Sequence, residues 1–173
     1  DAFDLSRFNV IDIDTYGAKV TVNNVEGDLQ VTNFSGDSSV AGVKGHSKVV
    51  AHSGSVSISK SSGSLDFVNG RGTFSLAAFE GPVKGQTDQG AVAAFIEGEA
   101  EVQIESNQAA VTVKAPSDSG ASIRLKTEDG TLSLPEKTKI SSSTKTYSGK
   151  LSGDGPKGSI AVKSKSGVLR IRL

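Results

Sequence analysis

Apolar and polar residues alternate in short runs along most of this chain, and a glycine opens each run. Residues 27–31, 54–58, 63–67 and 72–76 read Gly-Asp-Leu-Gln-Val, Gly-Ser-Val-Ser-Ile, Gly-Ser-Leu-Asp-Phe and Gly-Thr-Phe-Ser-Leu. The apolar side chains stand two and four places after the glycine, with small or polar residues between them. This two-residue period is that of a half-buried strand and not of a helix. Each run therefore predicts one short β-strand.

The glycines recur at a fixed spacing of nine residues. The series is Gly27, Gly36, Gly45, Gly54, Gly63, Gly72, Gly81 and Gly90, and the spacing returns at Gly149, Gly158 and Gly167. The residues between the runs are rich in Ser, Asn, Gly and charge, as turns are. Repetition at a short period indicates a repeat protein, in which each unit buries its apolar side against its neighbours. Each nonad is predicted to be one strand and one corner.

These features predict an all-β fold, a single-stranded parallel β-helix or β-solenoid with about 18–20 residues per coil. Two-residue hairpin turns are largely missing, so each strand is expected to pair in parallel with the strand one coil away. A two-faced coil of about 18 residues stacks Val40, Ile58 and Leu76 and puts Val50 on Val68. A three-faced coil of about 27 residues also gives mostly apolar columns. We expect a single domain over residues 1–173, with a cap and first strand in 1–16 and repeats in 17–173.

The repeat becomes irregular between about residues 91 and 145. The apolar pairs persist, but their intervals drift from nine to ten or twelve residues, which indicates insertions at corners. Glu99 and Gln108 stand where the glycine of the corner is expected. At the C-terminus, Arg170 and Arg172 occupy outward positions of a last strand with nothing after it. They are predicted to protect an open sheet edge, or alternatively to form the basic half of a head-to-tail contact.

Composition narrows the class of protein. The chain has 173 residues, of which 35% are hydrophobic and 5% aromatic, which a narrow repeat stack tolerates better than a layered globular core. No run is long enough to cross a bilayer, and no signal peptide is visible. The chain contains no Cys, which excludes disulfides and thiolate metal sites. It begins at Asp1 and contains no Met, which suggests a mature fragment whose leader has been removed.

Charge is distributed unevenly although the formal net charge is zero. Residues 1–117 hold 14 acidic and 8 basic side chains, and residues 118–173 hold 5 acidic and 11 basic. A solvated face is the ordinary explanation, and attraction to an anionic polymer or to the acidic end of another copy is the alternative. The candidate contact surface consists of the basic residues of the last segment: Lys137, Lys139, Lys145, Lys150, Lys157, Lys163, Lys165, Arg170 and Arg172.

No catalytic, cofactor or metal site is predicted. Regular calcium binding would need an Asp in every corner, and His46 and His52 have no repeated carboxylate partner. The acidic groupings, Asp12 with Asp14 and the series Glu97, Glu99, Glu101 and Glu105, are expected to be solvated stripes on one face of a strand and not a glycosidase pair. No Ser, His and Asp set is spaced to form a triad. Nucleic-acid binding is disfavoured because Tyr147 is the only aromatic residue among the C-terminal lysines.

Five segments carry a family resemblance: 25–31 (VEGDLQV), 43–45 (VKG), 51–58 (AHSGSVSI), 126–134 (KTEDGTLSL) and 165–171 (KSGVLRI). With these units the chain resembles the bacterial putative-adhesin β-solenoid family, in which Thr-x-Ser-Gly and Val-x-Gly units precede alternating apolar residues. The resemblance implies an exported, cell-envelope or surface protein of adhesin-like, unknown function without known catalysis. It supplies no catalytic residues.

Three functions follow as hypotheses. The first is a non-enzymatic, extracytoplasmic (secreted, periplasmic or cell-surface) adhesin-like binding or structural module that uses repetitive polar faces to contact a glycan or an anionic envelope polymer. The second is an envelope scaffold that assembles end to end with itself. The third is a carbohydrate-active β-helix enzyme.

Overall fold

The computed structural model describes residues 9–135, 146–151 and 153–173. Within these residues the chain is all-β, and thirteen mostly parallel strands form one sheet that does not close on itself. The strands are β1 (Val10–Thr15), β2 (Val20–Asn23), β3 (Asp28–Asn33), β4 (Ser38–Ala41), β5 (Lys44–Glu80), β6 (Val83–Ile96), β7 (Glu101–Ser106), β8 (Ala110–Lys114), β9 (Ser122–Thr127), β10 (Thr131–Ser133), β11 (Thr146–Lys150), β12 (Ser159–Ser164) and β13 (Val168–Arg172).

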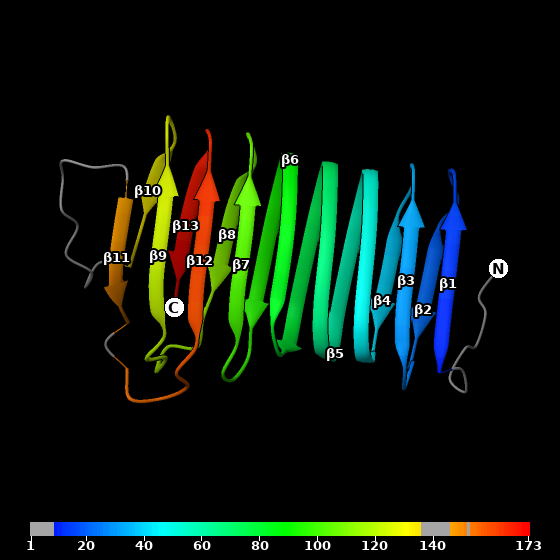
Figure 1. The fold of residues 1–173 in the computed structure, drawn as a ribbon, viewed down its shortest axis with the longest axis horizontal. Helices are drawn as coiled ribbons and strands as arrows, with labels where there is room; N and C mark the ends of the chain where they lie inside the picture. The colour runs from blue at the N-terminus through cyan, green and yellow to red at the C-terminus, as the bar shows by residue number, and fades with distance from the viewer. Residues whose placement is uncertain (1–8, 136–145, 152) are drawn as a thin grey trace.

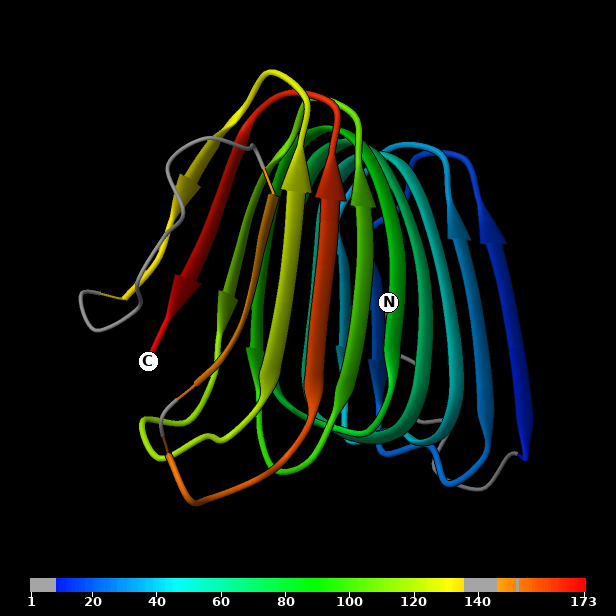
Figure 2. The same ribbon diagram turned by 60° about the vertical axis from the view of Figure 1, so that its left-hand side comes forward.

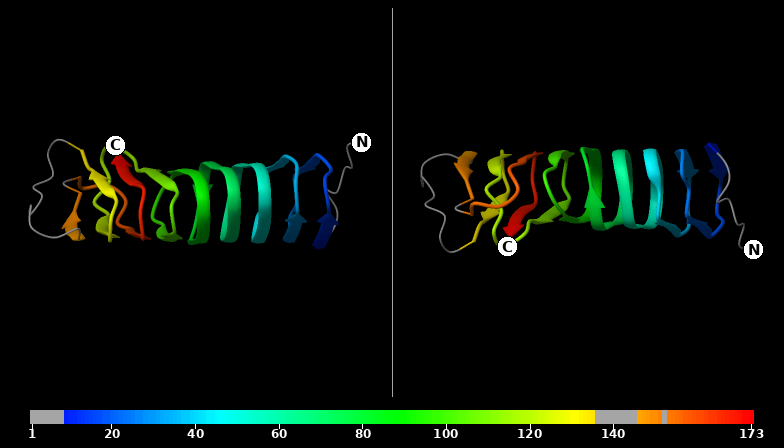
Figure 3. Two further views of the ribbon diagram at one scale, coloured as in Figure 1. Left: turned by 90° about the horizontal axis from the view of Figure 1, so that it is seen from above. Right: turned by 90° about the horizontal axis from the view of Figure 1, so that it is seen from below.

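The chain passes back and forth between two layers. Layer A contains β1, β3, β7, β12, β9 and β11, and layer B contains β2, β4, β8, β13 and β10 (Figure 1). The long strands β5 and β6 continue through corners and contribute to both layers, which joins the layers into one sheet. Figure 2 shows these passes one behind another, and Figure 3 shows them arranged along one long axis.

The parallel register has a constant spacing over most of the molecule. Val10 lies opposite Asp28, and Leu29 lies opposite Ser47, both 18 residues apart in sequence. From β6 to β7 the spacing becomes 19, with Val83 opposite Val102. Like positions of successive passes therefore form columns that run along the molecule.

Apolar columns form the core between the layers. Val22, Val40 and Ile58 are fully buried, and Val22 lies beside Val40 and Val40 beside Ile58 in layer B. The ring of Phe67 in layer A stacks on that of Phe74 in layer B, with 3.9 Å between ring centroids. The alternation of the sequence is thus the alternation between inward and outward side chains. The predicted pair Val50 and Val68 faces outward, where Val68 is 45% exposed.

Glycines at the corners allow the backbones of successive passes to approach one another closely. Gly27, Gly45, Gly63 and Gly81 form one column, and Gly36, Gly54, Gly72 and Gly90 form another. A Cβ on Gly54 would collide with the carbonyl oxygen of Gly36, and a Cβ on Gly63 with that of Gly45. The nine-residue spacing therefore reflects two columns of 18-residue spacing, one at each edge of the layers.

The corners that contain the Gly36 column also hold a column of mostly polar buried side chains. Its members are Asn33, Asn69, Thr87, Ser106, Ser164 and Thr127, all buried at the end of a layer A strand. Asn69 Nδ2 donates to the carbonyl oxygen of Gly72 at 3.2 Å and to Thr87 Oγ1 at 3.3 Å. These side chains satisfy backbone groups where the chain leaves the ladder.

The last passes are not stacked in the order of the sequence. In layer A the strand order is β7, β12, β9, β11, so the C-terminal strand β12 lies between β7 and β9. In layer B, β13 lies likewise between β8 and β10, with Leu169 beside both Val111 and Leu132. Figure 1 shows β12 in orange and β13 in red, inserted among the yellow and green strands.

This insertion corrects the expectation that the C-terminal strand is an open edge. Arg170 pairs with Thr112 on one side and with Ser133 on the other, so it does not protect an edge. Instead, β11 ends layer A by pairing antiparallel with β9. At the opposite end, β1 pairs only with β3 among the described residues, and most of the predicted cap, residues 1–8, lies outside them.

Candidate contact surfaces

The outer face of layer B carries small side chains in register. One row runs through Thr21, Ser39, Ser57 and Ser75, and Thr21 lies opposite Ser39 and Ser39 opposite Ser57. The row continues through Ala93 to Thr112. Because these positions alternate with buried apolar ones, the hydroxyl groups point away from the core at the strand spacing of about 4.8 Å. The result is a flat, repetitive and mostly uncharged surface.

The outer face of layer A is charged. Asp12 Oδ1 accepts a hydrogen bond from Gln30 Nε2 at 3.2 Å near the N-terminal end. Asp66 and Lys84 lie opposite each other on the next passes, and Arg124 stands in the same row near the far end. Acidic and basic side chains are mixed along this face, since Lys48 lies beside Gln30 and the exposed Glu101 and Glu105 lie on β7.

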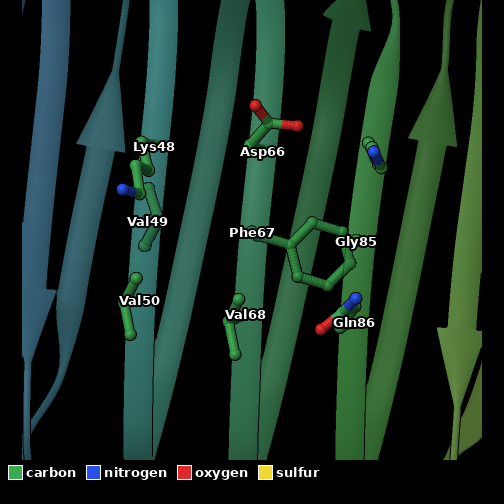
Figure 4. A pocket seen from close by; sticks show the side chains of 9 residues that line it. Lys48, Val49, Val50, Asp66, Phe67, Val68, Gly85 and Gln86 are labelled. Atoms are coloured by element: carbon green, nitrogen blue, oxygen red, sulfur yellow. The ribbon is translucent and has the colours of Figure 1, made fainter.

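Shallow cavities hollow the outer face of layer A. One of about 240 Å³ is lined by the outward side chains of Lys48, Asp66 and Gln86 (Figure 4). The ring of Phe67 lies on the core side of these strands and reaches Gly85, where a Cβ would collide with it. A larger cavity of about 460 Å³ spans β6, β7, β12 and β9. A third, of about 380 Å³, continues toward β11.

The predicted basic residues are divided between the two faces. Lys150 and Lys163 point outward from layer A, whereas Arg170 and Arg172 lie at outward positions of layer B. Lys157 and Lys165 lie outside the strands, before and after β12. Lys137, Lys139 and Lys145 lie outside the described residues. The structure therefore does not gather the described members of this set on one surface.

Sequence reasoning missed a different basic cluster. Lys163 on β12 lies directly opposite Lys126 on β9, and Arg124 stands two residues before Lys126 on the same face. Lys163 Nζ also contacts Glu105 Oε1 on β7 at 3.3 Å. No sequence signal could have found this cluster, because it depends on the insertion of β12 between β7 and β9.

The structure also brings together a Ser, His and Asp group that sequence spacing did not suggest. His46 Nδ1 lies 2.8 Å from Ser64 Oγ, and His46 Nε2 lies 3.7 Å from Asp66 Oδ2. The side chains of His46 and Asp66 are about half exposed, at 44% and 51%. A hydrolytic triad holds its imidazole between two hydrogen bonds beside an oxyanion site, and the distance to Asp66 is too long for the second bond. This group is best described as a surface cluster.

Three residues of the acidic series, Glu99, Glu101 and Glu105, have local partners. Glu101 and Glu105 are exposed on β7, where Glu101 Oε1 accepts a hydrogen bond from Gln103 Nε2 at 2.7 Å. Glu99, which precedes β7, accepts a hydrogen bond from the Lys157 backbone N–H at 3.4 Å. Among the described residues, no group of three or more His, Asp or Glu side chains is placed to hold a metal ion.

Aromatic rings stack on an exposed corner near the N-terminal end. Tyr16 and Phe34 are parallel with 4.7 Å between ring centroids, and the ring of His52 follows at 4.9 Å from Phe34. Tyr147, by contrast, is 6% exposed and points inward from β11. The aromatic surface is thus far from the basic cluster.

The chain was compared with known proteins. No family model matches it, and no curated protein matches it. A solved structure of a putative cell adhesion protein from Clostridium sporogenes ATCC 15579 is similar in fold, with a TM-score of 0.51 and 16% sequence identity. The match covers 65% of this chain and 56% of that protein, so it spans little more than half of the neighbour's length. Within the described residues no helix is long and apolar enough to cross a membrane.

Proposed function

We propose that this protein is a non-enzymatic, extracytoplasmic, adhesin-like binding module built as a two-faced parallel β-solenoid. The register spacings of 18 and 19 residues support a coil of that length with one strand in each layer. The similarity in fold to a protein described as a cell adhesion protein supports the adhesin-like part of the proposal. The absence of cysteine from the whole sequence is compatible with an envelope location.

The observation that carries the proposal is the repetition of the layer B surface. Thr21, Ser39 and Ser57 present hydroxyl groups at the same position of successive strands. A ligand with a regular repeat, such as a glycan or envelope polymer, can make the same hydrogen bond several times to such a row. Many weak, equivalent contacts then add to a useful affinity.

Binding to a panel of immobilised glycans and purified envelope polysaccharides tests this function. The variants Ser39→Gln and Ser57→Gln place a longer side chain in the middle of the row and should abolish binding of the ligand found. Thr32→Gln, a matched change on layer A, should leave it intact. If no glycan or envelope polymer binds the native protein, the proposal is wrong.

A self-assembling scaffold is the second candidate, and one observation favours it. β1 and β2 each pair on one side only among the described residues, and Val10 on β1 is 70% exposed. An unpaired strand is a template for another strand. Light scattering over a wide concentration range tests this alternative, and a monomer at every concentration and at low salt would contradict it.

A further inference from the structure

The largest of the cavities on layer A has small residues at its centre and cations at its ends. In the row that crosses β6, β7, β12 and β9, the outward residues are Lys84, Gln103, Ala161 and Arg124. Ala161 leaves a gap between the longer side chains of Gln103 and Arg124, and this gap is part of the 460 Å³ cavity. Lys84 and Arg124 stand three strand spacings apart, about 14 Å. The cavity is therefore a groove along the axis of the molecule, which we call the layer A groove.

Cations outnumber carboxylates among the residues that line the layer A groove, where Glu105 is the one carboxylate among three cations. Lys84, Arg124 and Lys163 line it, Lys126 adjoins it, and all four side chains are exposed. Among the described residues, Lys163 forms an ion pair with Glu105, whereas Lys84, Arg124 and Lys126 form none. Three further carboxylates border the groove, since Asp66, Glu101 and Glu128 line the adjoining cavities.

The fold places like charges side by side here. Lys126 and Lys163 are direct partners in the parallel register of β9 and β12. Like charges directly opposite each other on a sheet are destabilising. The inserted β12 creates this juxtaposition, and Glu105 offsets it from the β7 side through its ion pair with Lys163. An anion bound beside Lys126 and Arg124 would lower the repulsion further.

We propose that the layer A groove binds a linear acidic polysaccharide through its carboxylate groups. The strand spacing of about 4.8 Å is close to the length of one sugar unit in an extended chain, so a polymer along the groove can place carboxylates beside Arg124 and Lys84. The planar guanidinium of Arg124 suits a bidentate contact with a carboxylate. The amides of Gln86 and Gln103 are suited to sugar hydroxyl groups.

The lining of the groove favours a polysaccharide over a single-stranded nucleic acid. Single-stranded nucleic acids are held by aromatic side chains on which bases stack, and no aromatic ring lines this groove. The inference rests on the proposed function only in that both describe a binding module, since the two surfaces lie on opposite layers.

Polygalacturonate is the probe that tests the groove, with dextran as the neutral polymer and single-stranded DNA as the competing polyanion. The double variant Arg124→Gln, Lys126→Gln should weaken polygalacturonate binding about tenfold or more, because it removes two desolvated or partly desolvated charge contacts. The matched control is Arg170→Gln, Arg172→Gln, which makes the same change of net charge on layer B. Circular dichroism spectra and melting temperatures establish that both variants are folded.

Each outcome decides the proposal. Loss of binding in the layer A variant alone, with a salt-dependent affinity for polygalacturonate and little affinity for dextran or DNA, supports it. Equal losses in both double variants would show that only net charge matters and overturn it, as would tighter binding of DNA. If neutral glycans bind through layer B but polygalacturonate does not bind, the groove proposal fails and the proposed function stands.

Discussion

At the scale of the residue, the backbones of successive corners lie so close together that a side chain with a Cβ does not fit between them. Glycine fills these positions, and the nine-residue spacing of glycine in the sequence predicted them. The corners of the Gly27 column also need left-handed backbone three residues before each glycine, where Asn24, Gly42, Lys60 and Ala78 have φ values of 57, 69, 48 and 52°. These residues are 18 apart, yet three of them are not glycine, so composition did not reveal the column.

Ala78 is predicted to be a strained member of that column. A left-handed conformation costs a residue with a Cβ about 1–2 kcal/mol, so Ala78→Gly should raise the free energy of unfolding by about 0.5–1 kcal/mol. Ala77→Gly is the matched control, because Ala77 does not have a positive φ and glycine in a strand costs about 0.5–1 kcal/mol. Urea denaturation measures both. A lower stability for Ala78→Gly would contradict the explanation.

Ser47 is predicted to weaken the core. It is 1% exposed, it lies in an apolar column beside Leu29, and its Oγ has no hydrogen-bond partner. Ser47→Ala removes a buried hydroxyl that lost its water on folding, and should stabilise the protein by about 1 kcal/mol. Ser38→Ala should instead destabilise it by about 1 kcal/mol, because Ser38 Oγ accepts a hydrogen bond from Asn33 Nδ2 at 3.0 Å. Thermal unfolding measures the change in stability of both variants. Changes of the same sign would contradict the prediction.

At the scale of the element, strands and their inward faces were predictable, but their corners became ambiguous after residue 91. The expected corner residues there were Glu99 and Gln108. The structure instead stacks Gly158 on Ala100 and Gly167 on Ala109, because the pass from β6 to β7 contains one residue more than the passes before it. An alternating pattern fixes which residues face inward, but not at which corner an extra residue is accommodated.

β13 pairs with a strand on each side, β8 and β10, so its leucine should contribute more to stability than the leucine of β10. Leu169 on β13 is 1% exposed and Leu132 on β10 is only partly buried, although the two are direct partners. Leu169→Ala should therefore cost about 2–5 kcal/mol, and Leu132→Ala distinctly less. If β13 were the edge strand, the order would be reversed. Denaturant unfolding of the two single variants distinguishes these arrangements.

At the scale of the whole molecule, the order of the passes could not be predicted from the sequence. β9 carries Ile123 and Leu125 inward, and β12 carries Ile160 and Val162 inward. Both strands therefore present the same apolar pattern to β7, and either fits the position beside Val102 and Ile104. What separates them is the path of the connections, which the hydrophobic pattern does not describe. The basic cluster of the layer A groove was invisible for the same reason.

A disulfide can test this order directly, because the chain contains no cysteine. Gln103 and Ala161 are direct partners on β7 and β12, so their Cα atoms lie within the range of about 4.4–6.8 Å that a disulfide requires. Gln103→Cys with Ala161→Cys should form an intramolecular bond under mild oxidation. Closing a loop of this length should add up to about 4 kcal/mol of stability, measured against the reduced protein.

A second cysteine pair serves as the control, because it would form a disulfide only if the passes were stacked in the order of the sequence. If the passes followed the sequence, β9 would lie beside β7, and Gln103 would be the neighbour of Arg124. With β12 between them they are two strand spacings apart, about 10 Å, which is too far for a disulfide. Gln103→Cys with Arg124→Cys should therefore remain reduced under the same oxidant, as mass spectrometry of alkylated protein would show. Oxidation of this pair and not of the first would contradict the inserted order, and a disulfide-linked dimer of the first pair would mean that the C-terminal strands are exchanged between two copies.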